Sequence, residues 1–187
     1  MQIKLKVNDR ILHVASDLFY RQGYNQTGIN QIIAEADIAI GSLYNHFPSK
    51  NTLLLTYLKK QEVEWFEGFE NYCKGVTDPK EKIVKFIDYR IRQQKESDFS
   101  GCPFIKIASE LGVSDLNVLQ VVEAHKEKQR SLLNALFRQI EYDGPLSQKE
   151  LAGMLFLMVE GATINTTISR NTLALEGVKK IMRNIIT

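Results

Sequence analysis

The stretch from Thr27 to Lys50 reads TGINQIIAEADIAIGSLYNHFPSK, and it decides the fold of this chain. Its first half predicts a short helix, because apolar residues recur at helical spacing at Ile29, Ile32, Ile33 and Ala36. Thr27 is expected to cap that helix. Leu43 and Phe47, four residues apart, predict one apolar face on a second helix. Asp37 falls at the turn, where a short polar side chain tolerates left-handed backbone.

The rest of the second helix carries small and polar side chains with nothing apolar to cover them. Asn can bind adenine through two hydrogen bonds, and Ser, Tyr and His suit phosphates or base edges. The pattern therefore predicts a helix-turn-helix with its second helix in the DNA major groove. A solvated three-helix packing module remains the alternative on these residues alone. The predicted DNA contacts are Thr27, Gly28, Ile40, Gly41, Ser42, Tyr44, Asn45, His46 and Lys50.

From about Asp9 to Leu54, the chain resembles the DNA-binding domain of the TetR/AcrR family of bacterial transcriptional regulators. The most specific part is Gly-x-Leu-Tyr-x-His-Phe-x-x-Lys at residues 41–50. Further matching positions are Ile11, Ala15, Leu18, Phe19, Gly23, Thr27, Ile29, Ile32, Ala34 and Ala36. The resemblance implies a homodimeric repressor that binds double-stranded DNA at a palindromic operator and responds to a small-molecule effector.

Two positions depart from the family pattern. Asp37 stands in the turn where the family usually has Gly, and Ala39 stands where it usually has Ser or Thr as the cap of the recognition helix. Losing a capping hydroxyl costs on the order of 1 kcal/mol of helix stability. We expect the motif to persist because Leu43 and Phe47 still anchor it, but the phosphate bond of that hydroxyl is in doubt.

The whole chain is predicted to be all-α, with about nine helices. A helix-turn-helix DNA-binding domain is expected over residues 1–48, and a helical effector-binding and dimerisation domain over residues 49–187. Pro48 ends the recognition helix and Ser49 caps the next one. Outside the helix pair, the expected helices span about 8–22, 49–73, 79–95, 103–111, 114–141, 147–169 and 173–186.

Composition narrows the functional classes. The net charge is +2, and five cations oppose four carboxylates over residues 1–50, so DNA affinity must come from a few placed groups rather than from bulk charge. The three histidines are far apart, and no metal spacing, phosphate loop or nucleophile motif occurs, so neither an enzyme nor a cofactor is expected.

The longest apolar run, from Leu151 to Val159, is too short to span a bilayer, and no signal peptide is recognised. A cytoplasmic protein without membrane contact is expected.

The last two predicted helices suggest a dimer. The run from Leu151 to Val159 is apolar all round, and one chain of this size is not expected to cover it alone. A twofold four-helix bundle would cover it, and the resemblance implies the same. An ordinary buried core helix is the alternative. The predicted dimer residues are Met154, Leu157, Met158, Gly161, Val178, Ile181, Met182 and Ile185.

The region after residue 49 is rich in large apolar side chains, and the resemblance implies an effector pocket between its central helices. The expected lining residues are Phe66, Phe69, Tyr72, Phe86, Tyr89, Phe104, Phe137 and Met158. Possible polar contacts are Tyr72, Tyr89, Glu110, Gln139 and Asn165. For most of these residues, ordinary core packing is the alternative.

Cys102 offers a different sensing chemistry. The sequence Gly-Cys-Pro places its sulfur at a predicted helix start, where backbone amides favour a reactive thiol. A buried, inert residue closing a loop is the alternative.

Taken together with the resemblance, the sequence supports a repressor released by a small apolar or aromatic effector. The same architecture with a redox or electrophile sensor at Cys102 is the second hypothesis, and a helical binding protein that has lost DNA binding is the third.

Overall fold

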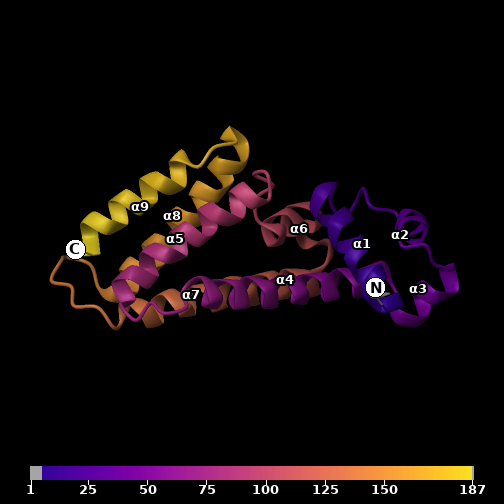
Figure 1. Ribbon diagram of the computed structural model, residues 1–187, viewed down its shortest axis with the longest axis horizontal. Coiled ribbons are helices and arrows are strands. Elements are labelled where there is room, and N and C mark those ends of the chain that lie inside the picture. Colours follow the sequence, from indigo (N-terminus) through magenta and orange to yellow (C-terminus); the bar gives the residue numbers. More distant parts are fainter. Residues whose placement is uncertain (1–5, 187) are drawn as a thin grey trace. The chain divides into compact units, whose positions relative to one another are not determined.

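The computed structural model describes residues 6–186, and these form nine α-helices, one short 3-10 helix and no strand (Figure 1). The all-α prediction is confirmed. The helices are α1 (Val7–Arg21), α2 (Ile29–Glu35), α3 (Ile40–His46), α4 (Lys50–Tyr72), α5 (Pro79–Glu96), α6 (Pro103–Leu111), α7 (Leu116–Phe137), α8 (Gln148–Ser169) and α9 (Leu173–Ile186), with the 3-10 helix η1 at Gly112–Ser114.

The chain forms two compact units. The head unit contains the described residues up to Val63 together with Pro103–Val122, and the body unit contains Glu64–Cys102 and the described residues from Glu123 onward. The division falls inside α4 and α7 rather than at the expected boundary after residue 48. Helix α6 joins the head because its polar side chains bind the end of α1: the Lys106 ammonium donates to the carbonyl of Tyr20 at 2.5 Å.

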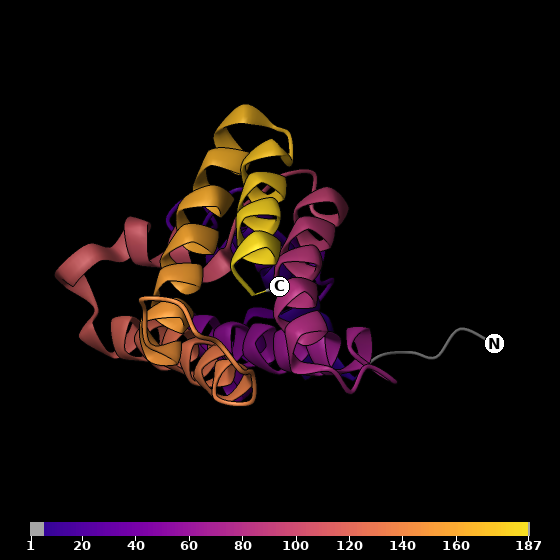
Figure 2. The same ribbon diagram turned by 90° about the vertical axis from the view of Figure 1, so that its left-hand side faces the viewer.

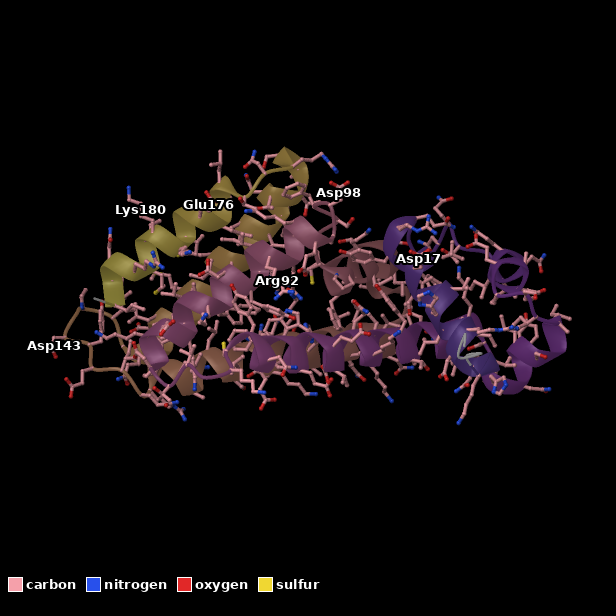
Figure 3. All side chains as sticks on the ribbon, in the orientation of Figure 1. Asp17, Arg92, Asp98, Asp143, Glu176 and Lys180 are labelled. Carbon is pink, nitrogen blue, oxygen red and sulfur yellow. The ribbon has the colours of Figure 1, made fainter. Side chains whose placement is uncertain are left out.

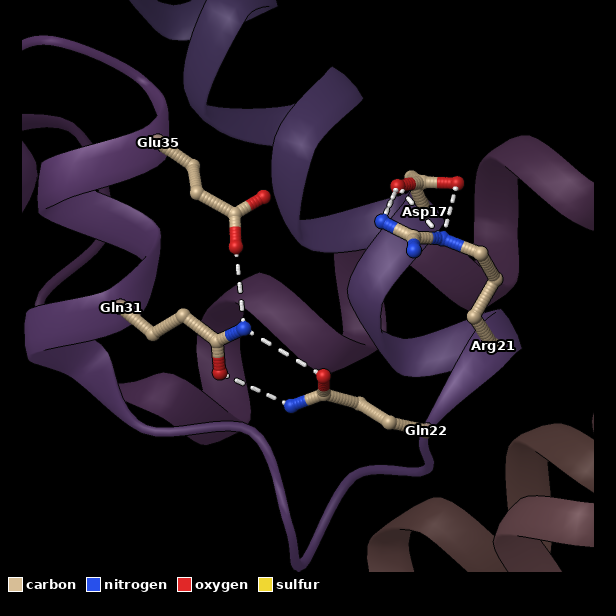
Figure 4. Close-up of polar contacts among 5 residues, drawn as sticks. All are labelled: Asp17, Arg21, Gln22, Gln31 and Glu35. Carbon is tan, nitrogen blue, oxygen red and sulfur yellow. Dashed lines mark hydrogen bonds and ion pairs between the residues drawn. The ribbon is translucent and has the colours of Figure 1, made fainter.

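The head unit is held by an apolar centre and a polar link between its first two helices. Helix α1 buries one face, formed by Ile11, Ala15, Leu18 and Phe19. On the outer side, the Gln22 amide donates to Gln31 at 2.8 Å, and Gln31 donates to Glu35 at 2.9 Å (Figure 4). Asp17 and Arg21 form an ion pair within α1. The polar link fixes the start of the helix pair against α1.

Local sequence signals set most helix starts. Ser49 accepts the backbone N–H of Thr52 at 3.0 Å and caps α4, as predicted. Asp78 caps α5 ahead of Pro79, and Ser147 forms a reciprocal capping box with Glu150 at the start of α8.

The end of α7 differs from the prediction by four residues. The helix ends at Phe137 rather than near residue 141. The N–H groups of Gln139 and Ile140 bond to carbonyls three residues back, which tightens the last turn. That turn brings Ile140 into the core, where its side chain is buried.

In the body unit, α9 lies along both α5 and α8 (Figure 2). The amphipathic α9 buries Leu175, Val178, Met182 and Ile186, while Glu176 and Lys180 lie on its outer side (Figure 3). The other large members of the body core are Trp65, Phe69, Phe86, Tyr89, Phe137 and Phe156.

Helix α8 is longer than the apolar run recognised in the sequence. By length and composition alone, its 22 residues could cross a membrane, with a mean hydropathy of 1.4 over the most apolar window. The run from Leu151 to Val159 is therefore only part of a longer apolar helix. Leu151, Leu155 and Val159 of this helix are nevertheless buried in the core of the body unit.

Candidate DNA interface, dimer face and effector region

Helix α3 is anchored on one side and open on the other. Leu43 is fully buried and Phe47 nearly so, because their spacing of one turn directs both toward α1 and α2. On the other side Ile40 and Tyr44 are about half exposed, at 56% and 46%. Gly41, Asn45 and His46 are also exposed, and Ser42 is half-buried. The expected open face exists, and DNA contact by these residues stays a prediction.

The turn between α2 and α3 has the geometry expected for its unusual residue. Asp37 has a φ of +50°, in the left-handed region. The Arg10 guanidinium on α1 donates to the Asp37 carbonyl at 2.8 Å, which ties the turn to the head core. Ala39 occupies the N-cap of α3 without any side-chain hydrogen bond, so the first turn of α3 lacks the usual cap.

Two of the predicted DNA contacts, Thr27 and Lys50, form hydrogen bonds within the head unit. Thr27 is buried and its hydroxyl donates to the Gly23 carbonyl at 2.6 Å, while the exposed Gly28 is the N-cap of α2. The prediction that Thr27 caps α2 is therefore wrong, and its side chain is not available to DNA. The Lys50 ammonium donates to the Tyr24 carbonyl at 2.6 Å, and burial lowers the pKa of Lys50. The Lys50 side chain makes this bond within the head unit, and its contact with a phosphate stays a prediction.

The outer face of α8 carries an apolar stripe. Leu157, Gly161, Ile164 and Ile168 are exposed at intervals of four, three and four residues, so they share one side of the helix. Leu157 is 70% exposed and Ile168 is 78% exposed. Leu173 and Ile181 add exposed apolar groups on α9. We call these six residues the α8–α9 stripe.

The predicted dimer residues divide into three groups by their exposure. Leu157, Gly161 and Ile181 are exposed. Val178 and Met182 are buried in the core of their own unit and are not available to a partner, so that part of the prediction is wrong. Met154, Met158 and Ile185 are partly buried against the same core. Sequence reasoning missed Ile164, Ile168 and Leu173, although the helical spacing of the first two with Leu157 could have indicated them.

The predicted effector residues are not gathered around one cavity. Phe66 and Phe69 line a cleft of about 600 Å³ between α4, α5 and α7 of the body unit. The other lining residues are Glu70, Asn71, Cys73, Lys74, Lys82, Leu132 and Leu136. Buried core positions are taken by Phe86, Tyr89 and Phe137.

Other members of the predicted effector set lie apart from this cleft. Phe104 is buried in the head unit, and Met158 packs partly against the body core. Tyr72 is half-buried, with the Lys85 ammonium 5.0 Å from its ring centroid.

The proposed polar contacts also have other places. In the head unit, the Glu110 carboxylate accepts the backbone N–H of Asn25 at 2.8 Å. Gln139 donates to the Ala135 carbonyl, and Asn165 is exposed. None of these three positions supports a contact with a ligand buried in the body unit.

A group of polar residues that sequence reasoning missed lies inside the body unit. Helices α5, α7 and α8 contribute the members, which we call the buried cluster: Arg90, Gln94, His125, Lys126, Gln129 and Glu160. The Lys126 ammonium lies 2.6 Å from a Glu160 carboxylate oxygen, and Arg90 Nη2 lies 3.7 Å from the other oxygen. Charged side chains are usually solvated, so their residue types alone do not predict a place inside the core. The sequence could have indicated them, because Arg90 and Gln94, like His125 and Gln129, lie one helical turn apart on the same side as the core residues of their helix.

His125 is neutral in this cluster. Its burial, followed by the charges of Lys126, Arg90 and Lys128, lowers its pKa from 6.5 to about 3. The ring packs edge-on against Trp65, with centroids 5.9 Å apart. Within residues 6–186, no group of three His, Cys, Asp or Glu side chains is placed to hold a metal ion.

Comparison with known proteins places this arrangement in a family. Residues 11–57 match the family model described as bacterial regulatory proteins, tetR family. Residues 79–181, more than half of the chain, match the C-terminal domain of LmrA/YxaF-like transcriptional regulators. The chain belongs to the TetR family.

Two of the similar proteins, LmrA and SCO4454, match nearly the whole chain, whereas QacR matches about a third of it. The transcriptional regulator LmrA of Bacillus subtilis is 27% identical over 181 residues, which cover 95% of each chain. The regulator QacR of Staphylococcus aureus is 38% identical over 66 residues, or 35% of each chain. The crystal structure of SCO4454, a TetR-family regulator from Streptomyces coelicolor, superposes with a TM-score of 0.84 at 22% identity, covering 97% of this chain and 96% of that one.

Membership settles the general activity. The TetR family consists of DNA-binding transcriptional regulators rather than enzymes, and its members bind operator DNA and small-molecule effectors and act as dimers. The protein is accordingly a DNA-binding regulator of the helix-turn-helix type.

Proposed function

We propose that the protein is a cytoplasmic homodimeric repressor whose α3 helices bind a palindromic operator and which a small apolar or aromatic effector releases from DNA. The main support for DNA binding is the exposed face of α3. It is held on Leu43 and Phe47, and presents Tyr44, Asn45 and His46 to solvent. A helix supported in this way can enter the major groove without rearrangement of the head.

The DNA-binding assignment is tested by a gel shift with the promoter DNA upstream of the protein's own gene. Asn45→Ala and Tyr44→Ala should each weaken binding by about 1–3 kcal/mol if the residue reads a base. His13→Ala, on the exposed side of α1, is the matched control and should bind normally. Normal affinity in both α3 variants would remove this helix from the interface. No binding by the wild type would favour a helical binding protein that has lost DNA function.

Features of the body unit support the binding of a small apolar or aromatic effector. The cleft beside Phe66 and Phe69 and the aromatic core around Trp65 offer the apolar surface that a flat molecule needs. An effector acts by binding the released conformation more tightly than the DNA-bound one. Addition of effector should therefore abolish the gel shift while leaving the protein folded and dimeric.

A second candidate trigger is favoured by one contact. The Lys126 ammonium lies 3.5 Å from the Cys102 sulfur, and a neighbouring cation promotes attack by that sulfur on electrophiles. Peroxide would transfer one oxygen to sulfur, giving a sulfenic acid, and the other would leave as water. Cys102 is buried, which restricts reagent access and favours the small-molecule trigger.

The Cys102→Ser variant separates the two triggers. If a bound molecule is the signal, the variant should still be released by that molecule. If Cys102 is the sensor, peroxide or an alkylating agent should release the wild type from DNA and spare the variant. Cys102 would be the sensor if the variant were no longer released from DNA by these reagents and if calorimetry showed no binding of aromatic or apolar candidates.

A further inference from the structure

The buried cluster joins polar residues from three helices at the centre of the body unit. Arg90 and Gln94 lie one turn apart on α5, and His125 and Gln129 lie one turn apart on α7. Lys126 and Glu160 link α7 to α8. Apart from Glu160, whose side chain is 18% exposed, all of these residues are at least nine-tenths buried. Such a cluster is costly to bury and invites a functional explanation.

The charges of the cluster do not cancel. Arg90 and Lys126 supply two cations, and Glu160 supplies one carboxylate. His125 is neutral because its pKa is about 3. The interior therefore carries an excess of one positive charge. A buried unpaired charge is strongly unfavourable unless an opposite charge reaches it.

Several buried polar atoms also lack hydrogen-bond partners among the described residues. Within the buried cluster they include two guanidinium nitrogens of Arg90, both amide atoms of Gln129 and the amide oxygen of Gln94. A buried polar group that nothing satisfies destabilises the fold. The Arg90 and Gln129 nitrogens are donors, so they suit an acceptor such as a carboxylate.

Aromatic rings border the same cluster. The Arg90 guanidinium lies 5.7 Å from the Trp65 ring centroid, and His125 contacts both Trp65 and Phe66 edge-on. Phe66 also lines the cleft between α4, α5 and α7. Phe66 therefore lines the cleft and also contacts His125 of the buried cluster, whereas none of the six cluster residues lines the cleft itself.

We propose that the effector is an aromatic molecule with a single anionic group, whose anion binds the excess positive charge and the unpartnered donors of Arg90 and Gln129 while its ring packs beside Trp65 and Phe66. The proposal rests on the proposed effector-responsive function and names the ligand class for it. One negative charge neutralises the cluster, whereas a cation would be repelled by it.

Calorimetric titration with three matched probes tests the charge requirement: 2-naphthoate, its neutral counterpart 2-naphthamide, and the cation 2-naphthylmethylammonium. The dimeric full-length protein is used without DNA, so failure of operator binding does not affect the measurement. Naphthoate should bind at least about 10-fold more tightly than the amide, because a charge-assisted hydrogen bond in a buried site contributes that much. The cation should bind least.

Variants locate the site. Arg90→Gln should reduce naphthoate affinity by about 10-fold or more and remove most of the preference over the amide. Gln129→Leu, which keeps the volume and removes the donors, should weaken naphthoate with a smaller effect on the charge preference. Arg92→Gln is the matched control, because Arg92 is two positions along α5, exposed and paired with Glu96. It should bind as the wild type does.

Three results would overturn the proposal: equal affinity for naphthoate and naphthamide, absence of binding by every probe below about 1 mM, or full naphthoate affinity in a folded Arg90→Gln protein. Thermal unfolding of each variant checks that it is folded. If Arg90→Gln fails to fold, Gln129→Leu decides, and unchanged naphthoate binding there would equally sink the proposal. A gel shift run in parallel shows separately whether DNA binding, and hence the proposed function, survives.

Discussion

At the scale of single residues, the neutral state of His125 makes stability depend on pH. Its pKa is lowered to about 3 in the folded protein, chiefly by burial, against 6.5 when unfolded. Below about pH 6.5 the unfolded chain therefore binds a proton that the folded chain does not. The free energy of unfolding should fall as the pH drops from 6.5 toward 3, by up to about 1.4 kcal/mol per pH unit.

Urea unfolding followed by the fluorescence of Trp65, the single tryptophan, measures this effect in the body unit. Between about pH 6.5 and about pH 5, His125→Phe should flatten the slope while keeping the ring contacts with Trp65 and Phe66. His13→Gln, an exposed substitution in the head, should leave the slope unchanged. An equally steep slope in His125→Phe would show that other groups cause the pH dependence.

At the scale of one element, α3 lacks a side-chain cap and can be improved. Ala39 occupies the N-cap with extended backbone but offers no oxygen to the free amides of the first turn. Ala39→Ser should stabilise the protein by about 1 kcal/mol in thermal unfolding. Ala34→Ser, an exposed position inside α2, is the control and should be neutral or slightly destabilising. No gain from Ala39→Ser would mean that the first turn is already satisfied by water.

At the scale of the whole molecule, dimerisation is expected through the α8–α9 stripe. Leu157→Glu places a carboxylate in the α8–α9 stripe, and burying it against a partner would be strongly unfavourable. Sedimentation should then show a folded monomer, with weaker operator binding because two half-sites are no longer engaged together. Lys95→Glu, on the exposed side of α5, adds the same group away from the stripe and should remain dimeric. A dimeric Leu157→Glu protein would place the interface elsewhere.

The fold and the head could be predicted from the sequence because their signals are local. Capping by Ser49 and the spacing of Leu43 and Phe47 depend on neighbours within one helical turn. The left-handed residue at Asp37 is likewise a property of the turn itself. These features follow from short stretches of chain, and the exposed face of α3 follows from them.

Only the tertiary structure decided the roles of residues whose partners are distant in the sequence. Thr27 and Lys50 have the chemistry of DNA contacts, yet they bond to carbonyls of the loop after α1. Met182 looks like an interface residue, yet it lies on the face of α9 that is buried in the body core. Arg90 and Glu160 are separated by 70 residues and meet only because three helices pack together. Helical periodicity shows which residues share a face, but which face meets which depends on packing between elements far apart in the chain.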